Sequence, residues 1–184
     1  MNDALAKLEV SGAVVLVVDI QEKLLPAIDG AEMCAAAAGR MIEAGRVLEL
    51  PVLVTEQYPA GLGPTCAAIR AAIGDVTPVV KTRFSACVDE LVQQMVRLSR
   101  RQVIVVGIEA HVCVQQTVLD LLRTGYLPYV CADAVSSRRA VDRETALHRM
   151  RQAGAIVTTT ESAIFELLGQ AGTEQFKRIL KFVK

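Results

Sequence analysis

Short runs of consecutive apolar residues recur along the chain and carry the strongest structural signal in its pattern. Residues 13–19 (AVVLVVD) and 103–106 (VIVV) are almost entirely apolar and rich in β-branched side chains. Strands without alternation between apolar and polar residues are buried on both faces, as in a parallel sheet covered by helices. The pattern therefore predicts six such strands, with the other four expected at residues 52–55, 78–81, 126–132 and 155–159.

Segments with helical spacing lie between these runs. The longest is rich in Ala, Met, Leu and Glu and is followed by Pro51, which ends it. Asp29 and Thr65 are candidate N-caps of the first two helices. The loop between them, residues 56–64, is dense in Gly and Pro and is predicted to be irregular. The helices are expected over residues 29–50, 65–73, 89–98, from about 112, 140–153 and 161 onward, with a break at 169–172.

Strands that alternate with helices predict an α/β fold. We expect a three-layer sandwich, in which a six-stranded parallel sheet of the Rossmann-like kind is flanked by helices on both faces. The 184 residues suit one domain spanning residues 1–184, and 52% hydrophobic with 22% charged residues is a globular composition.

Charge and apolar run length limit the class of partner. Twenty basic and twenty acidic residues cancel, whereas a general nucleic-acid binder normally carries a basic excess. No apolar run reaches the roughly 18–20 residues that span a bilayer. The first ten residues contain two acids and no Arg, unlike a secretory or transit peptide. We therefore expect a cytoplasmic protein that binds neither nucleic acid nor membrane.

The cysteines and histidines argue against disulfides and metal. Five cysteines, an odd number without a CxxC pair, fit reduced thiols in a cytosolic protein. The two histidines, His111 and His148, have no companion at ligand spacing, so neither a zinc site nor another metal or cofactor site is expected.

Three reactive side chains fall at predicted strand ends, where open α/β sheets bind their ligands. Asp19 ends the first strand, Lys81 ends the third, and Cys113 follows the central one. Cys113 lies between the end of a strand and the start of a helix, where the positive end of the helix dipole favours the thiolate form of its side chain. Aspartate can take the thiol proton and lysine can stabilise the thiolate. Taken singly, each residue has a non-catalytic interpretation. Cys113 could be a small apolar core residue, Asp19 could cap the loop after its strand, and Lys81 could be a solvent-exposed charge.

The chain resembles the isochorismatase-like cysteine hydrolases over about residues 10–165, and it is most similar to the isochorismatase-domain-containing branch. The segments that carry the superfamily resemblance are Val18-Asp19-Ile20-Gln21, Val80-Lys81-Thr82 with Phe84-Ser85, and Gly107-Ile108-Glu109-Ala110-His111-Val112-Cys113-Val114. The branch is indicated by Thr55-Glu56-Gln57-Tyr58-Pro59, by the segment from Gly107 to Cys113 and by Ser136-Ser137-Arg138.

The resemblance implies an Asp–Lys–Cys triad that hydrolyses an acyl bond. Asp19 would be the general base, Cys113 the nucleophile and Lys81 the residue that holds the pair. The oxyanion hole would use the backbone N–H groups of Cys113 and of Glu109, the latter after a cis peptide bond from Ile108. Gln21, Tyr58 and Phe84 are expected to line a small substrate pocket, although Tyr58 and Phe84 could equally belong to the core.

Departures from family patterns narrow the substrate. Nicotinamidases carry metal-binding histidines after the second strand, where this chain reads Glu56-Gln57-Tyr58-Pro59. Some isochorismatases are fused to a carrier-protein domain, and the 184 residues leave no room for such a domain beside the hydrolase domain. We therefore expect cofactor-free hydrolysis of a small amide, at its C–N bond, or of a related ester. The alternatives are an inert interaction protein with the same fold and, less favoured, a nuclease. The resemblance and the long apolar faces of helix 29–50 and of the C-terminal helix also predict a homo-oligomer.

Overall fold

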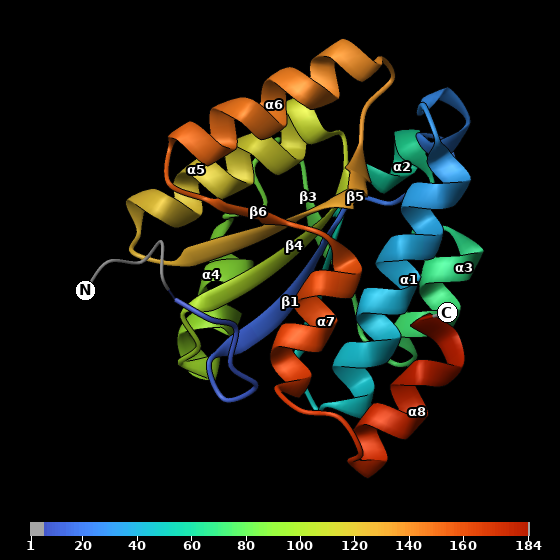
Figure 1. The fold of residues 1–184 in the computed structure, drawn as a ribbon. Coiled ribbons are helices and arrows are strands. Elements are labelled where there is room, and N and C mark those ends of the chain that lie inside the picture. The colour runs from blue at the N-terminus through green and yellow to red at the C-terminus, as the bar shows by residue number, and fades with distance from the viewer. Residues whose placement is uncertain (1–5, 184) are drawn as a thin grey trace.

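A six-stranded parallel sheet forms the middle layer of the protein (Figure 1). The computed structural model describes residues 6–183. The strand order is β3-β2-β1-β4-β5-β6, and every neighbouring pair is parallel, which confirms the predicted fold class. The strands are β1 (Ala13–Val18), β2 (Val52–Gln57), β3 (Val79–Lys81), β4 (Gln102–Ile108), β5 (Leu127–Ser136) and β6 (Ile156–Thr158).

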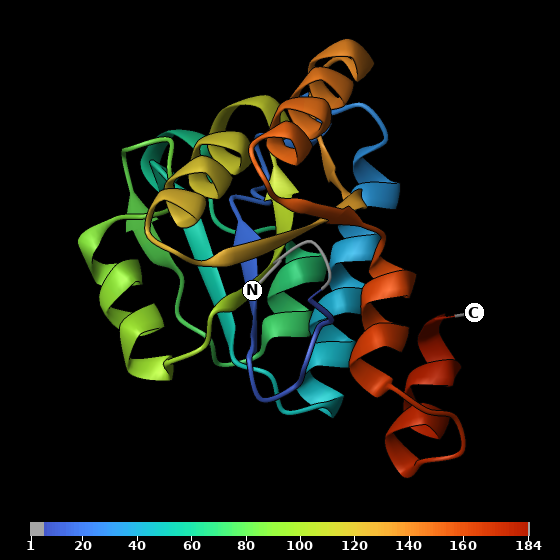
Figure 2. The same ribbon diagram turned by 60° about the vertical axis from the view of Figure 1, so that its left-hand side comes forward.

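Helices cover both faces of this sheet. In Figures 1 and 2, α1, α3, α7 and α8 lie on one face, and α4, α5 and α6 lie on the other. A short π-helix, η3, joins β4 to α5. The helical segments are η2 (Leu25–Ala27), α1 (Ala31–Val47), α2 (Pro59–Leu62), α3 (Ala67–Ile73), α4 (Asp89–Leu98), η3 (Ala110–Val114), α5 (Gln115–Arg123), α6 (Ala140–Gln152), α7 (Thr160–Leu168) and α8 (Glu174–Val183).

The sheet separates two hydrophobic clusters, which explains why its strands show no polar alternation. Val15 and Val17 of β1 pack into the cluster beneath α1, whereas Val14 and Leu16 pack into the cluster beneath α4 and α5. Successive side chains of a strand point to opposite faces, so a strand covered on both sides is apolar at each position. Burying each such side chain contributes about 1.5–3 kcal/mol.

Two predicted helix caps are wrong, because long-range contacts fix where these helices begin. Asp29 does not cap α1: the N-cap is Gly30, in a left-handed conformation, and the Asp29 N–H donates to the carbonyl of Ser137 at 2.9 Å. Thr65 does not cap α3, whose N-cap is Cys66. The Thr65 N–H and hydroxyl instead donate to Oε1 of Glu56, at 2.6 and 2.7 Å.

The segment after Thr55 is more regular than predicted. β2 continues to Gln57, because residues 55–57 pair in register with residues 79–81 of β3. The helix α2 then occupies residues 59–62 of the predicted loop. β5 is also longer than predicted: it runs to Ser136 past an irregularity in its pairing with β4.

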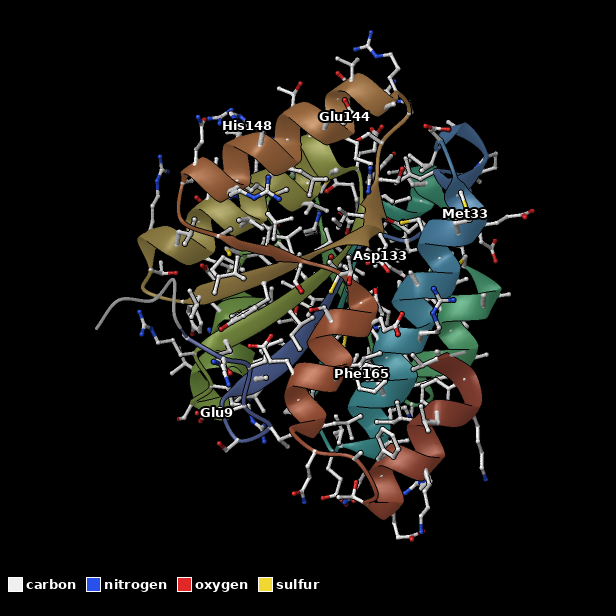
Figure 3. All side chains as sticks on the ribbon, in the orientation of Figure 1. Glu9, Met33, Asp133, Glu144, His148 and Phe165 are labelled. Atoms are coloured by element: carbon white, nitrogen blue, oxygen red, sulfur yellow. The ribbon has the colours of Figure 1, made fainter. Side chains whose placement is uncertain are left out.

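The apolar faces of the long helices are used inside the molecule. Met41 and Ile42 of α1, Ile164 of α7 and Ile179 of α8 are fully buried in one cluster. Phe165 of α7 packs edge to face against Phe176 of α8, with ring centroids 6.3 Å apart (Figure 3). These faces therefore take part in the core of a single chain, and by themselves they give no separate argument for assembly.

None of the helices within residues 6–183 combines the length and the apolar character that a bilayer crossing requires.

Candidate active site

The three predicted reactive residues meet at the carboxyl edge of the sheet, where the strand order reverses. β1 and β4 are neighbours there, and their crossovers lead to opposite sides. Asp19 directly follows β1, Lys81 ends β3, and Cys113 lies in η3 after β4. Open α/β sheets place ligands at this point, so the fold brings these residues to the expected position for a site.

Asp19 and Lys81 form a fully buried ion pair. Nζ of Lys81 lies 2.6 Å from Oδ2 of Asp19, and neither side chain is exposed. The Thr55 hydroxyl donates to Oδ1 of Asp19 at 2.7 Å. A buried charge pair is tolerated only where further hydrogen bonds satisfy both groups.

The remaining partners of Lys81 come from β2 and from the loop after β3. Its ammonium donates to Oε1 of Gln57 at 2.9 Å and to the carbonyls of Arg83 and Phe84 at 3.2 and 3.1 Å. Thr55 and Gln57 were not predicted as site residues. The signal was present, because polar residues two positions apart in a strand share one face.

Cys113 is buried beside this pair, close enough for the charges of both Asp19 and Lys81 to act on its thiol. Burial raises the pKa of the Cys113 thiol to about 12; the Asp19 charge also raises this pKa, whereas Lys81 lowers it. The expectation that position favours a thiolate is therefore wrong for the resting site. Desolvation disfavours the anion, and the nearest charge to the sulfur is negative. The site holds a thiol next to a carboxylate base.

Thr117 fixes the helical turn that contains Cys113. Its hydroxyl donates to the carbonyl of Cys113 at 2.6 Å and accepts the N–H of Ala86 at 2.8 Å. Thr117 is fully buried in α5, one turn beyond Cys113, and it links η3 to the segment that follows Lys81. Sequence reasoning did not single it out, because a threonine within a helix carries no local mark of such a role.

The backbone at Gly107 allows β4 to approach Asp19 closely. Gly107 has a φ of +140°, and a Cβ at this position would lie 2.1 Å from the carbonyl oxygen of Val18. Val18 is the last residue of β1 and pairs with Gly107 in register. Asp19 itself has a positive φ of +52°, which L-residues adopt at a cost of order 1–3 kcal/mol. Only glycine fits at position 107 without moving the strand that positions Asp19.

The peptide bond between Ile108 and Glu109 is cis, which confirms that expectation. The Glu109 carbonyl accepts the N–H groups of Val112 and Val114 at 3.1 and 3.2 Å. The Glu109 carboxylate pairs with Arg138, Nε to Oε2, at 2.8 Å. The backbone of Glu109 therefore lies directly before the π-helix that holds Cys113.

The three predicted pocket residues differ in their surroundings. Gln21 is fully buried, and its amide donates to the carbonyls of Gln57 and Gly63 at 3.0 and 2.6 Å. Its side-chain oxygen also accepts the Gln57 N–H at 2.7 Å. The Gln21 amide thus connects the end of β2 to the loop at Gly63, and its hydrogen bonds go to the protein rather than to a ligand. Tyr58 and Phe84 are 56% and 54% exposed, which excludes the core reading for both. The Tyr58 N–H donates to the Lys81 carbonyl, and the Phe84 carbonyl accepts the Lys81 ammonium. Both residues therefore lie next to Lys81.

The two histidines lie apart from each other. His148 is exposed on the outer side of α6 (Figure 3), and Nδ1 of His111 lies 3.0 Å from the hydroxyl of Ser137. Across residues 6–183, no three His, Cys, Asp or Glu side chains gather as metal ligands.

Comparisons with known proteins give consistent matches along most of the chain. Residues 13–162 match the family described as Isochorismatase domain. Isochorismatase domain-containing protein 2 of Xenopus laevis is 40% identical over 180 residues, which are 97% of this chain and 87% of the relative. The structure of MAR1 ribonuclease from Caenorhabditis elegans has a TM-score of 0.92 at 40% identity, covering 97% of this chain and 92% of that one. The YcaC gene product of Escherichia coli, described as an octameric hydrolase of unknown specificity, has a TM-score of 0.89 at 23% identity, covering 96% of this chain and 90% of that one.

Proposed function

Because this chain belongs to the isochorismatase domain family, we propose that it is a cysteine hydrolase that cleaves a small amide, at its C–N bond, or a related ester. Asp19, Lys81 and Cys113 would be its catalytic residues, and no cofactor is assigned. One observation carries the proposal: a buried thiol lies beside a carboxylate that is itself held in a buried ion pair. This arrangement supplies a nucleophile and its base in one dry site.

The first half of the reaction forms a thioester. As the Cys113 sulfur attacks the substrate carbonyl carbon, the thiol proton moves to Asp19, so that no free thiolate has to exist in the buried site. The carbonyl oxygen becomes an oxyanion, which the backbone N–H groups of Glu109 and Cys113 would stabilise. Each such donor typically contributes about 3 kcal/mol to the barrier reduction. The C–N bond then breaks, and Asp19 returns its proton to the departing nitrogen.

The second half of the reaction releases the acid. Asp19 takes a proton from water as the water oxygen attacks the thioester carbon, and the C–S bond breaks. The proton returns to sulfur, which restores the Cys113 thiol. Lys81 would hold the Asp19 side chain in place between these transfers, because its ammonium lies 2.6 Å from the carboxylate. Tyr58 and Phe84, both exposed beside Lys81, would border the substrate.

A panel of small amides and esters tests this proposal. We expect activity in the wild type and none in Cys113→Ala, because alanine removes the attacking sulfur. Cys66→Ala is the matched control, since Cys66 is 7% exposed and Cys113 is 6% exposed, yet Cys66 packs in the cluster beneath α1, whereas Cys113 packs in the cluster on the other face of the sheet. A panel in which Cys113→Ala keeps the wild-type rate would refute the assignment. A folded wild type without any turnover would favour the inert interaction protein.

RNA hydrolysis is the second candidate, because the Caenorhabditis elegans neighbour at 40% identity is described as a ribonuclease. Zero net charge is unlike a general nucleic-acid binder, and Lys81 and Arg138 are paired with Asp19 and Glu109. We therefore place this function second. Cleavage of single-stranded RNA by the wild type but not by Cys113→Ala would move it to first place.

We also propose a homo-oligomer and a cytoplasmic location. The Escherichia coli neighbour is described as octameric, and all five cysteines of this chain are free thiols, as in a reducing compartment.

A further inference from the structure

Three residues at the end of β5, Ser136–Arg138, contact both loops beside the nucleophile. The Ser136 hydroxyl donates to the carbonyl of Asp29 at 2.6 Å, next to α1. The Ser137 hydroxyl lies 3.0 Å from Nδ1 of His111 in η3. Nε and the backbone N–H of Arg138 both donate to Oε2 of Glu109, at 2.8 and 3.3 Å. The segment therefore contacts the loop before α1 through Ser136, and the connection between β4 and α5 through Ser137 and Arg138.

We propose that Arg138 is a positioning residue of the hydrolase, which holds Glu109 so that its backbone N–H faces the reacting carbonyl. The inference rests on the proposed function, because it takes Glu109 as an oxyanion donor. It adds a role for the Glu109 side chain, which the triad does not use, and for an arginine that touches neither the thiol nor its base.

The geometry favours positioning over a contribution to stability. The Arg138 side chain is 60% exposed, and exposed ion pairs contribute little to the free energy of folding. The Glu109 carboxylate is only 12% exposed, and two donors of a single residue bind one of its oxygens. The Glu109 carbonyl is bound at the same time by Val112 and Val114. Glu109 is thus held by its side chain and by its carbonyl, which fixes the direction of its N–H.

Arginine suits this role better than lysine. Nε of Arg138 lies close to its own backbone, so that Nε and the backbone N–H reach the same carboxylate oxygen together. A lysine ammonium sits at the end of a longer flexible stem and has no donor at the position of Nε. Arg138→Lys should therefore keep the charge and lose part of the positioning.

Two reagents separate the oxyanion hole from the nucleophile. Acylation of Cys113 by p-nitrophenyl acetate passes through an oxyanion, whereas alkylation by iodoacetamide does not. In Arg138→Ala we expect acylation to slow about tenfold, less than the 10²–10³ for outright removal of a donor, while alkylation keeps the wild-type rate. The acylation rate of Arg138→Lys should lie between those of the wild type and Arg138→Ala.

Arg139→Ala is the matched control. Arg139 is the next residue, is 74% exposed and makes the same kind of pair, with Nε 2.7 Å from Oδ2 of Asp142, but it does not contact Glu109. It should keep both rates. Equal acylation rates in the two alanine variants would overturn the inference, and so would a parallel loss of acylation and alkylation in Arg138→Ala, which indicates a collapsed site.

Hydrogen exchange tests the same contact without any turnover. The amides of Val112 and Val114 donate to the Glu109 carbonyl, so their exchange should become faster in Arg138→Ala and stay unchanged in Arg139→Ala. If the wild type is not acylated at all, the proposed function fails while this measurement still decides the contact. Unchanged exchange in Arg138→Ala contradicts the positioning role.

Discussion

At the scale of single residues, Asp19 joins all the chemistry of the site. One carboxylate oxygen accepts the Thr55 hydroxyl and the other accepts the Lys81 ammonium, while the charge of the same group acts on the Cys113 thiol. In the proposed reaction, the carboxylate is therefore both the counter-ion of a buried lysine and the acceptor for the thiol proton. These two roles have opposite effects on the sulfur, because the Asp19 charge raises the pKa of Cys113 and the Lys81 charge lowers it.

Asp19→Asn should lower the pKa of Cys113 and abolish turnover. The substitution removes the negative charge and leaves Lys81 as the nearest charge, so the thiolate is favoured and the pKa falls below about 12. At any pH below that value, more thiolate means faster alkylation, whereas asparagine cannot carry the proton to the leaving nitrogen. Iodoacetamide labelling from pH 7 to 11, read by peptide mass spectrometry, measures the shift.

Thr55→Val serves as the control for this experiment, since it removes a hydrogen bond to Asp19 and keeps the charge. Its labelling profile should stay close to that of the wild type. Circular dichroism checks that Asp19→Asn is folded, because an unpaired buried Lys81 costs about 3–5 kcal/mol. Slower labelling of Asp19→Asn at every pH would mean that the carboxylate acts on the thiol mainly as a base, against this prediction.

Residue types at strand ends indicated the positions of Asp19, Lys81 and Cys113, and the family resemblance was needed to interpret them as a triad; neither indicated the state of the thiol. Apolar runs and parallel strands place the three residues at one carboxyl edge. The protonation of Cys113 depends on burial and on the Asp19 charge, which no local pattern contains. Thr55 and Gln57 were missed although their spacing puts them on one face, because their partners Asp19 and Lys81 are distant in sequence. Thr117 was missed because nothing near it in sequence indicates its bond to Ala86.

At the scale of elements, the close pairing of β1 with β4 depends on Gly107. Gly107→Ala should destabilise the fold by about 3 kcal/mol or more, because its Cβ would lie 2.1 Å from the Val18 carbonyl oxygen in a backbone conformation with positive φ. Urea denaturation measures the loss. Gly39→Ala in α1 is the control: nothing lies within 4 Å of its Cβ, and alanine should add about 0.5–1 kcal/mol. Equal stabilities of the two variants would contradict the close approach.

The sheet was predictable at this scale, whereas several element ends were not. The apolar runs gave all six strands, and α4 begins and ends at the predicted residues. The starts of α1 and α3 were misplaced because Asp29 and Thr65 bond to distant segments instead of capping the next helix. The extension of β2 depends on pairing with β3, and pairing between strands is a tertiary property.

At the scale of the whole molecule, we expect more than one chain per particle. The chain mass is 19.8 kDa, so light scattering should give about 40 kDa or a higher multiple. The apolar faces of α1 and α8 are partly buried within the chain, so these faces alone do not identify the contact. A mass of about 20 kDa across a dilution series would refute assembly.

The Asp19–Lys81 ion pair also ties β3 to the middle of the sheet. β3 is a three-residue strand at one edge, and so short an edge strand is expected to open easily by itself. Opening would withdraw Lys81 and leave the Asp19 carboxylate buried without a counter-charge, which is strongly unfavourable. This short edge strand is thereby coupled to the centre of the molecule. Sub-global opening at this edge and loss of the candidate active site become one event, because the same ion pair belongs to both.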